Sequence, residues 1–423
     1  MSLQRPNAVW HAVLAATTTL CALGAAGSAQ AQQGETVKIA WIDPLSGLMA
    51  SVGSNQLKSF QYVSDYFNTQ SKNNPAGVKF EVQGFDNKLS PQETASLVRS
   101  AIDQGFRYIV QGNGSGNSLA IMEALERHNA RNPGKEVVFI NHSGVDPEMT
   151  NEKCSYWHFR LDADTTMKMR ALAQFIGQQG EVKKVYLINQ NYGHGQQVTR
   201  YARQYLKEYA PDVQIVGEDF HPLAQVRDFA PYIAKIRQSG ADAVISGNWG
   251  SDLSLLVKAA NDAGLKDVKF FVYYGTASGS PTAFGSAAEG KVYEVFYSHM
   301  NLPGEIGEIT RGFKDKFKED MYTTSVYNGL AMLSHAMHKA GSTDPLKVAA
   351  AMEGLEFPGA HGTLTMRKDD HQLQQGLFIT RWSKASDAMP YSQENTGLAF
   401  QPVQHFKPAQ ASTPTTCQMK RPS

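Results

Sequence analysis

Two successive series of short β-rich runs, separated by helical stretches, constrain the fold of this 423-residue chain more than any other feature. Strands of the first series are expected at residues 37–42, 78–82, 106–110 and 137–140. Strands of the second series are expected at 184–188, 213–216, 241–245 and 270–274. Because strands and helices alternate, each series predicts a mainly parallel sheet with right-handed helical crossovers. Two series therefore predict two α/β lobes.

The pattern changes after residue 293. Long helices are expected at 322–339 and 345–352, followed by strands at 363–366 and 377–382 that can cross between the lobes. We therefore predict two Rossmann-like lobes with mainly parallel sheets, joined by a hinge of three crossing strands. The N-terminal lobe is expected to hold residues 36–160 and 298–366, the C-terminal lobe residues 161–297 and 367–405, and residues 406–423 form a polar tail.

The N-terminus has the pattern of a cleaved signal peptide. Arg5 is followed by an almost uncharged apolar stretch at 12–26, and small residues then precede a cleavage site expected after Ala31. The apolar stretch is short for a membrane anchor. Leu20 stands where a lipoprotein signal before Cys21 needs a small residue. Residues 1–31 therefore predict export to the periplasm.

Cleavage would leave two cysteines, Cys154 and Cys417, in a compartment that permits disulfides. A bridge between them would fasten the polar tail to the body of the protein. Two free, buried thiols are the alternative that the sequence leaves open.

Composition and motifs argue against several classes of function. The formal net charge is only +1, and without a basic stripe the long-range field that attracts nucleic acid is missing. No later apolar run is long enough to predict membrane insertion of the mature chain. The 12 histidines lack metal-binding spacing, and no nucleophile elbow is found, so we expect no enzyme, metal or cofactor.

Polar loops follow three strands of the first series. They are residues 44–47, the glycine-rich stretch 112–118 and residues 141–144. The glycine spacing does not match a dinucleotide loop, so a carboxylate-binding loop or an ordinary tight turn is expected at 112–118. Ligands of open parallel sheets bind at the carboxyl ends of the strands. The candidate contacts in these loops are Ser46, Asn113, Ser115, Asn117, Ser118, Asn141, His142 and Ser143.

Aromatic residues follow the strands of the second series. The candidates there are Tyr192, Trp249, Tyr273, Tyr274 and Thr276. Rings at this edge can close over an apolar ligand, although one of the adjacent Tyr273 and Tyr274 is expected to pack in the core.

Several segments, in order, carry a family resemblance over residues 37–382. They are Pro44-Leu45-Ser46-Gly47 with Gly53, Asp86 with Ser90-Pro91, Phe159-Arg160 with Asp164, and Tyr192-Gly193-x-Gly195. In these segments the chain resembles type I periplasmic solute-binding proteins of the leucine/isoleucine/valine-binding class. The resemblance implies a monomer that binds a small molecule between two lobes and delivers it to the permease of an ABC importer.

The resemblance also shows a departure from the amino-acid binders. The hydroxyls that hold the ligand's α-carboxylate in the family correspond to Asn117 and to residues 143–145, and a clamping tyrosine corresponds to Trp249. The glutamate that pairs with the ligand's α-ammonium would fall at 274–276, where this chain has no acid. Burying an ammonium without a carboxylate is costly, which favours an aromatic or other carboxylate, or an amide, over a branched-chain amino acid. The alternative functions are a ligand-sensing module of the same fold and an exported hydrolase.

Overall fold

The computed structural model of the chain describes residues 1–3 and 33–422. The expected signal peptide and its cleavage site lie, apart from the first three residues, outside this part of the chain. Within it, no helix is long and apolar enough to cross a membrane.

Sheet A is a parallel sheet of five strands in the order β2-β1-β3-β4-β5. Its strands are β1 (Thr36–Asp43), β2 (Lys79–Asp86), β3 (Tyr108–Gln111), β4 (Val138–Asn141) and β5 (His158–Arg160). Connecting helices are α1 (Ala50–Thr69), α2 (Pro91–Asp103) and α3 (Ser115–Arg131), with short 3-10 helices η1 (Gly47–Met49) and η2 (Pro147–Thr150). The start of α2 follows from its sequence, since Ser90 caps the helix by accepting the Glu93 N–H and Pro91 occupies the first turn.

Sheet B has seven strands in the order β15-β14-β10-β9-β8-β6-β7. Five are parallel: β6 (Lys184–Gln190), β7 (Gln214–His221), β8 (Ala243–Ser246), β9 (Lys269–Val272) and β10 (Val292–Phe296). Two antiparallel strands, β14 (Leu377–Lys384) and β15 (Leu398–Phe406), extend the sheet beyond β10. The accompanying helices are α4 (Thr165–Gln179), α5 (Gly193–Tyr209), α6 (Ala230–Ser239), α7 (Ser251–Asp262) and α8 (Ser280–Phe284), with 3-10 helices η3 (Ser286–Ala288) and η4 (Gln393–Asn395).

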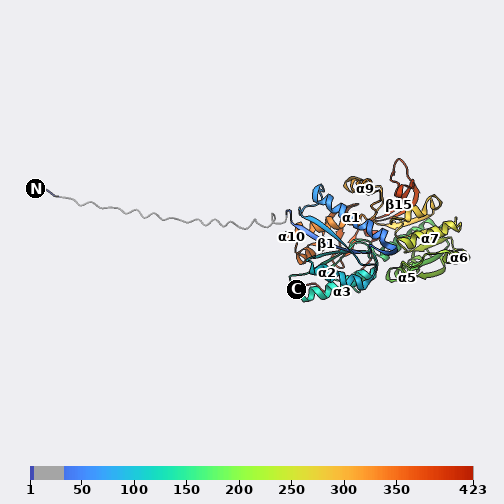
Figure 1. Cartoon of the computed structure of the whole chain (residues 1–423), viewed down its shortest axis with the longest axis horizontal. Helices are drawn as coiled ribbons and strands as arrows, with labels where there is room; N and C mark the ends of the chain where they lie inside the picture. The colour runs from blue at the N-terminus through green and yellow to red at the C-terminus, as the bar shows by residue number, and fades with distance from the viewer. Residues whose placement is uncertain (4–32, 423) are drawn as a thin grey trace.

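The segment between β10 and β14 packs with sheet A, although it follows sheet B in the sequence. It contains helices α9 (Gly304–Phe317), α10 (Ser325–Ala340) and α11 (Pro345–Met352), and the small antiparallel sheet C of β11 (Glu356–Gly359), β12 (Gly362–Met366) and β13 (Leu373–Gln374). Apolar residues of α10 and sheet C share one buried core with β1 and α1. Figure 1 shows α10 beside β1, at the end of the molecule away from α6 and α7.

Two bodies result from this chain path. The first body is formed by the core that holds residues 37–161 and 302–373, and the second by the cores of residues 163–297 and 377–411. The chain passes between them at 161–163, 297–302 and 373–377. The lobe boundaries inferred from the sequence describe which residues should move together, and they remain a prediction.

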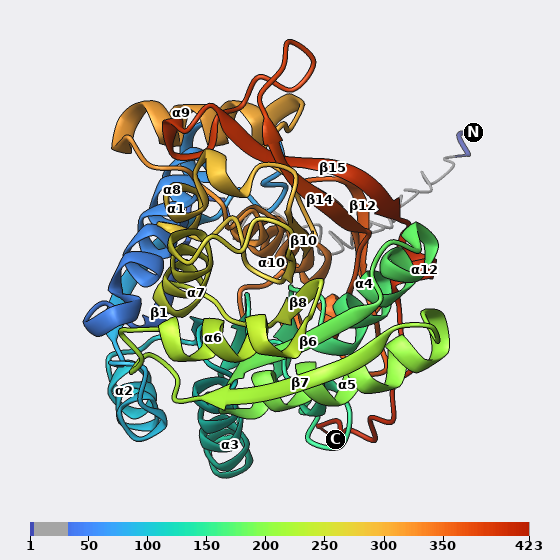
Figure 2. The same cartoon turned by 90° about the vertical axis from the view of Figure 1, so that its right-hand side faces the viewer.

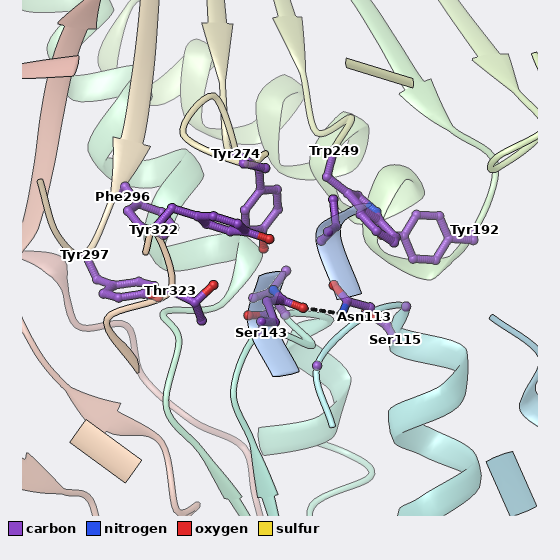
Figure 3. A pocket seen from close by; sticks show the side chains of 16 residues that line it. Asn113, Ser115, Ser143, Tyr192, Trp249, Tyr274, Phe296, Tyr297, Tyr322 and Thr323 are labelled. Atoms are coloured by element: carbon purple, nitrogen blue, oxygen red, sulfur yellow. Dashed lines mark hydrogen bonds between the residues drawn. The ribbon is translucent and has the colours of Figure 1, made fainter. Parts of the chain in front are cut away.

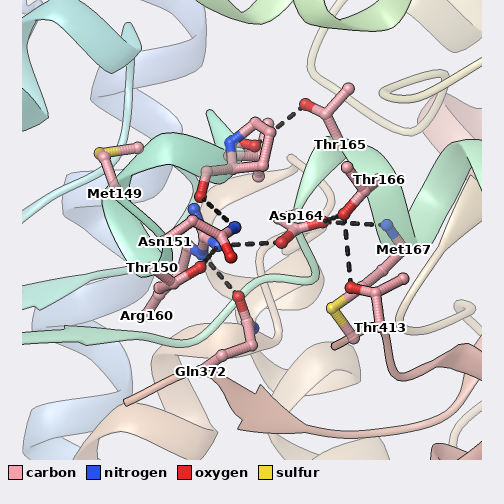
Figure 4. Close-up of polar contacts among 12 residues, drawn as sticks. Met149, Thr150, Asn151, Arg160, Asp164, Thr165, Thr166, Met167, Gln372 and Thr413 are labelled. Atoms are coloured by element: carbon pink, nitrogen blue, oxygen red, sulfur yellow. Dashed lines mark hydrogen bonds and ion pairs between the residues drawn. The ribbon is translucent and has the colours of Figure 1, made fainter. Parts of the chain in front are cut away.

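Arg160 connects two of these passages from a fully buried position at the end of β5. Its guanidinium donates to the Asp146 carbonyl at 2.6 Å and to the Gln372 amide oxygen at 2.6 Å, and also to the hydroxyl of Thr150 (Figure 4). It pairs with Asp164 at 3.1 Å, and Asp164 in turn caps α4. A buried cation without partners is costly, so Arg160 must keep these partners and thereby holds the segments that supply them together.

The C-terminal tail runs from the second body back to the first. After α12 (Pro408–Ala411), which contacts α4, the Thr415 hydroxyl donates to the Thr150 carbonyl. Cys417 forms a disulfide with Cys154, so the bridge expected from the sequence is present. Arg421 then pairs with Glu353 at 2.8 Å. The tail therefore makes a fourth connection between the two bodies, in addition to the three passages.

Loss of the disulfide should weaken the folded state. We expect the double variant Cys154→Ser/Cys417→Ser to lose about 2–5 kcal/mol of unfolding free energy, because the bridge closes a long loop that is otherwise free in the unfolded chain. Urea unfolding with and without reductant measures the change. Reductant should lower the stability of the parent protein and leave the double variant unaffected; equal stability of parent and variant would contradict this account.

A second stability prediction concerns Glu294 on β10, which is fully buried. Burial raises the pKa of its carboxyl from 4.5 to about 7, although the N–H and hydroxyl of Thr276 donate to it. Since the folded pKa lies above the unfolded one, the stability that Glu294 contributes is complete below pH 4.5 and is lost as the pH rises through 7. Between pH 5 and pH 8 the parent protein should lose about 2.5 kcal/mol of unfolding free energy through Glu294, and Glu294→Gln should abolish that loss. Denaturant unfolding at both pH values measures the change. The control variant is Glu208→Gln, at an exposed glutamate of α5, and its unfolding free energy should depend on pH as that of the parent protein does.

Candidate ligand-binding site

A cavity lies where the two bodies meet, between the loops that follow their strands. Its empty volume is about 480 Å³, including the open space at its mouth. The lining residues are Val52, Gln56, Gly112, Asn113, Gly114, Ser115, Ser143, Val145, Tyr192, Trp249, Tyr274, Ala277, Phe296, Tyr297, Tyr322 and Thr323. None of these 16 side chains is charged.

Asp43, at the end of β1, organises the part of the wall that comes from the first body. Its buried carboxylate accepts hydrogen bonds from the N–H groups of Gly112 (3.0 Å) and Asn113 (2.8 Å) and from the Gln111 side chain (3.0 Å). The Nε2 of His142 lies 2.9 Å from the same carboxylate. A Cβ at position 112 would come within 2.5 Å of the His142 ring, so the loop needs glycine there. Asp43 thus holds the Asn113 loop against the sheet.

Helix α3 begins at this loop and directs its N-terminus at the cavity. Gly114 precedes the helix with φ of 84°, a conformation that favours glycine, and no side chain of the described residues caps the helix. The first N–H groups of a helix lack partners within the helix and favour an acceptor or an anion. Asn113 and Ser115 stand beside them, and Asn113 donates to Gln56 on α1 (Figure 3). This wall can therefore hold a carboxylate or carbonyl oxygen.

Two aromatic side chains form the wall from the second body. The indole N–H of Trp249 donates to the Tyr192 hydroxyl at 2.9 Å, which fixes the two rings relative to each other. Trp249 precedes α7, and Tyr192 precedes α5. Figure 3 shows both rings on the opposite side of the space from Phe296 and Tyr297. An apolar or aromatic ligand body can lie between these rings.

The third wall contains three unpaired hydroxyl groups. The hydroxyls of Tyr274, Tyr322 and Thr323 are buried and have no hydrogen-bond partner among the described residues. Burial raises the pKa of Tyr274 and of Tyr322 well above the usual value, so both phenols stay protonated at neutral pH and can donate. A buried hydroxyl without a partner costs about 1–3 kcal/mol, which a ligand can recover.

The two bodies touch across the mouth of the cavity. Met49 and Val52 of the first body pack with Trp249 and Ala277 of the second, leaving Trp249 only 6% exposed. The fit is close, since a Cβ at Gly250 would lie 2.6 Å from the Met49 sulfur. The structure therefore has its cleft closed.

The structure brings six of the candidate residues together around the cavity: Asn113, Ser115, Ser143, Tyr192, Trp249 and Tyr274. Six others do not line it: Asn117, Ser118, Asn141, His142, Tyr273 and Thr276. Each of these six bonds to protein groups instead; for example, Ser118 donates to Gln111 and Tyr273 to the Thr165 carbonyl. Ser46 lies in a separate surface depression with Lys88 and Pro222.

Seven lining residues lie outside the ligand-binding segments predicted from the sequence: Val52, Gln56, Ala277, Phe296, Tyr297, Tyr322 and Thr323. The last four contribute rings and hydroxyl groups to the cavity wall. Phe296 and Tyr297 lie at the second passage between the bodies. Tyr322 and Thr323 fell inside a helix expected to begin at 322, whereas α10 begins at Ser325. The change of pattern after residue 293 could have located Phe296 and Tyr297, because it marks the return of the chain to the first body.

Comparison with known proteins agrees with this geometry. Residues 36–387 match the family model described as periplasmic binding protein. The chain is 31% identical to Leu/Ile/Val-binding protein homolog 4 of Brucella abortus (strain 2308) over 97% of this chain and 98% of that protein. It also resembles the closed crystal structure of a leucine-, isoleucine-, valine-, threonine- and alanine-binding protein from Brucella ovis, with a TM-score of 0.80 and 30% identity over 92% of this chain and 100% of that one.

A more distant structure shares the fold. It is a solute-binding protein of an ABC transporter from R. palustris in complex with 4-hydroxybenzoate, with a TM-score of 0.73, 20% identity, and coverage of 88% of this chain and 97% of that one. These relatives are named as binding proteins and not as enzymes. With its two α/β bodies, the cavity between them and the family match over most of its length, the chain belongs to the periplasmic binding protein family.

Proposed function

We propose that this chain is the periplasmic substrate-binding component of an ABC importer, which captures a small organic ligand between its two bodies and delivers it to the permease. The observation that carries the proposal is a cavity lined by residues of both bodies and closed by contacts between Met49, Val52 and Trp249. A ligand that contacts both walls stabilises the closed state, and the closed state is what a permease can recognise. The low net charge and the uncharged cavity fit a small organic ligand better than a metal ion or a polymer.

The proposed ligand contacts are the lining residues Asn113, Ser115, Ser143, Tyr192, Trp249 and Tyr274. A carboxylate or amide oxygen would face α3 and Ser143, and the ligand body would lie against Trp249 and Tyr192. Aromatic carboxylates, other carboxylates and amides fit this arrangement. The names of the relatives add branched-chain amino acids as the second candidate class.

A thermal-shift screen tests the proposal directly. The mature protein is heated with branched-chain amino acids, aromatic carboxylates, other short carboxylates and short amides. A specific ligand raises Tm with concentration by mass action. A hit with leucine or valine would favour the second candidate class. No shift with any compound, together with no small molecule found by native mass spectrometry of protein purified from its own cells, would contradict the proposal.

The intrinsic fluorescence of Trp249 should report closure. Trp41, Trp157 and Trp382 are buried within one body or the other, whereas Trp249 is buried by contact between them. Opening exposes its indole to water, so the ligand-free protein should emit at longer wavelength than the protein saturated with a hit. Trp249→Phe should abolish this difference, and Trp157→Phe should retain it. A spectrum that ligand leaves unchanged in the parent protein would count against hinge closure.

Trp249 should also contribute strongly to affinity. Removing a buried indole forfeits about 2–3 kcal/mol of apolar contact, so we expect Trp249→Ala to weaken binding about 30- to 150-fold. Isothermal titration with the best compound of the screen measures the loss. Tyr201→Ala is the matched control, because Tyr201 lies on α5 outside the cavity lining. Equal loss in both variants would indicate general destabilisation and not a ligand contact.

A further inference from the structure

A buried cation lies behind the aromatic wall of the cavity. The ammonium of Lys168, on α4, is 4.5 Å from the centre of the Tyr274 ring and 5.4 Å from that of Phe296. It is also 6.0 Å from the centre of the Tyr297 ring, so it interacts with three rings that line the cavity. These distances are those of cation–π contacts. Lys168 is fully buried and pairs with Asp162 at 2.7 Å, with Asp162 equally buried.

This arrangement disfavours a ligand cation beside Tyr274. The faces of the three rings already interact with the Lys168 ammonium and are less available to a second cation in the cavity. Among the described residues that line the cavity, none supplies a carboxylate to offset a cation's loss of hydration. The buried acids on the Lys168 side, Asp162 and Glu294, accept hydrogen bonds from Lys168 and from Thr276. His194, which packs edge-on against Tyr274, has its pKa lowered to about 3 by burial and is neutral.

The same wall offers hydrogen-bond donors. The hydroxyls of Tyr274 and Tyr322 point into the space between the walls (Figure 3) and have no partner among the residues that the structure describes. Tyr322 and Thr323 come from the first body and Tyr274 from the second, so one acceptor atom of a ligand can bond to both bodies at once. The hydroxyls of Tyr274 and Tyr322 can also accept a hydrogen bond from a donor group of the ligand. A ligand ammonium, however, would find no carboxylate among the described lining residues to balance its charge.

We infer that the ligand carries an uncharged hydrogen-bond acceptor, such as the carbonyl of a 2-oxo acid, where an α-amino acid carries its ammonium. This inference rests on the proposed binding function and narrows its ligand class to carboxylates with a neutral second polar group. The carboxylate faces the start of α3, and the acceptor receives hydrogen bonds from Tyr274 and Tyr322. The ammonium of Lys168, behind the aromatic wall, favours an acceptor atom beside Tyr274 because it places positive charge near that atom.

The test compares ligands that differ only at the second carbon. Isothermal titration of the mature protein uses two carbon skeletons, those of leucine and phenylalanine, each as the amino acid, the 2-oxo acid and the acid without a substituent at that carbon. We expect the 2-oxo acid to bind at least about tenfold more tightly than the amino acid of the same skeleton, since one satisfied buried hydroxyl corresponds to about that factor.

Tyr274→Phe and Tyr273→Phe form a matched pair of variants. Tyr274→Phe removes only a hydroxyl that has no partner, so the protein should fold with undiminished Tm while its affinity for the 2-oxo acid falls about tenfold. Its affinity for the unsubstituted acid should change less than about twofold, because that ligand has no acceptor there. Tyr273→Phe removes a bond to the Thr165 carbonyl outside the cavity, and should lower Tm without changing either affinity.

The outcomes separate this inference from the proposed function. If an amino acid binds as tightly as its 2-oxo acid, or if Tyr274→Phe leaves their affinity ratio unchanged, the inference is overturned and the binding function stands. If no form of either skeleton binds, the inference is also overturned. The proposed function is then still tested by the wider thermal-shift screen and by native mass spectrometry.

Discussion

The buried guanidinium of Arg160 is the interaction on which the arrangement of the two bodies depends. A buried guanidinium must keep its partners, and its partners come from separate parts of the chain: the Asp146 carbonyl, Thr150, the cap of α4 at Asp164, and Gln372. Gln372 also donates to the Asp162 carbonyl, so the first and third passages are joined side by side. These segments cannot separate without leaving charge unpaired in the interior. Arg160 and Gln372 therefore hold the two bodies together in this region, and a second contact joins the bodies where Met49 meets Trp249.

The cavity combines two kinds of wall that differ in how they are fixed. On the first body, Asp43 holds the Asn113 loop by backbone hydrogen bonds, which leaves the start of α3 free for an acceptor. On the second body, aromatic rings are fixed by packing and by the Trp249–Tyr192 hydrogen bond. The cavity thus has fixed polar groups on one side and fixed apolar rings on the other. The buried ion pair of Lys168 and Asp162 lies behind these rings and takes up no space in the cavity.

The sequence predicted the parts of the structure that follow from local pattern. Alternating strands and helices gave both parallel sheets, and because parallel strands end at one edge, Asn113, Ser143, Tyr192 and Trp249 could be placed near one site. Residues whose role depends on distant segments could not be placed in this way. Tyr322 and Phe296 reach the cavity only because the chain returns to the first body, and Asn141 and His142 point away from it because Asp43, Gly144 and His158 engage them. A loop position predicted from the sequence does not reveal which polar side chains are hydrogen-bonded to other protein groups and therefore do not face the cavity.

The fourth connection has a consequence for reporting ligand binding with fused probes. Sheet A begins at Thr36, and the tail returns to the same body, where Cys417 is bridged to Cys154 and Arg421 pairs with Glu353 (Figures 1 and 2). Thr36 and Cys417, near the two ends of the described part 33–422, are thereby both anchored to the first body. A pair of fluorophores attached at the two termini would keep a constant separation while the cleft opens and closes. An optical biosensor built on this scaffold needs one label inserted in the second body, for instance in the turn between α5 and β7, where residues 211 and 212 are exposed.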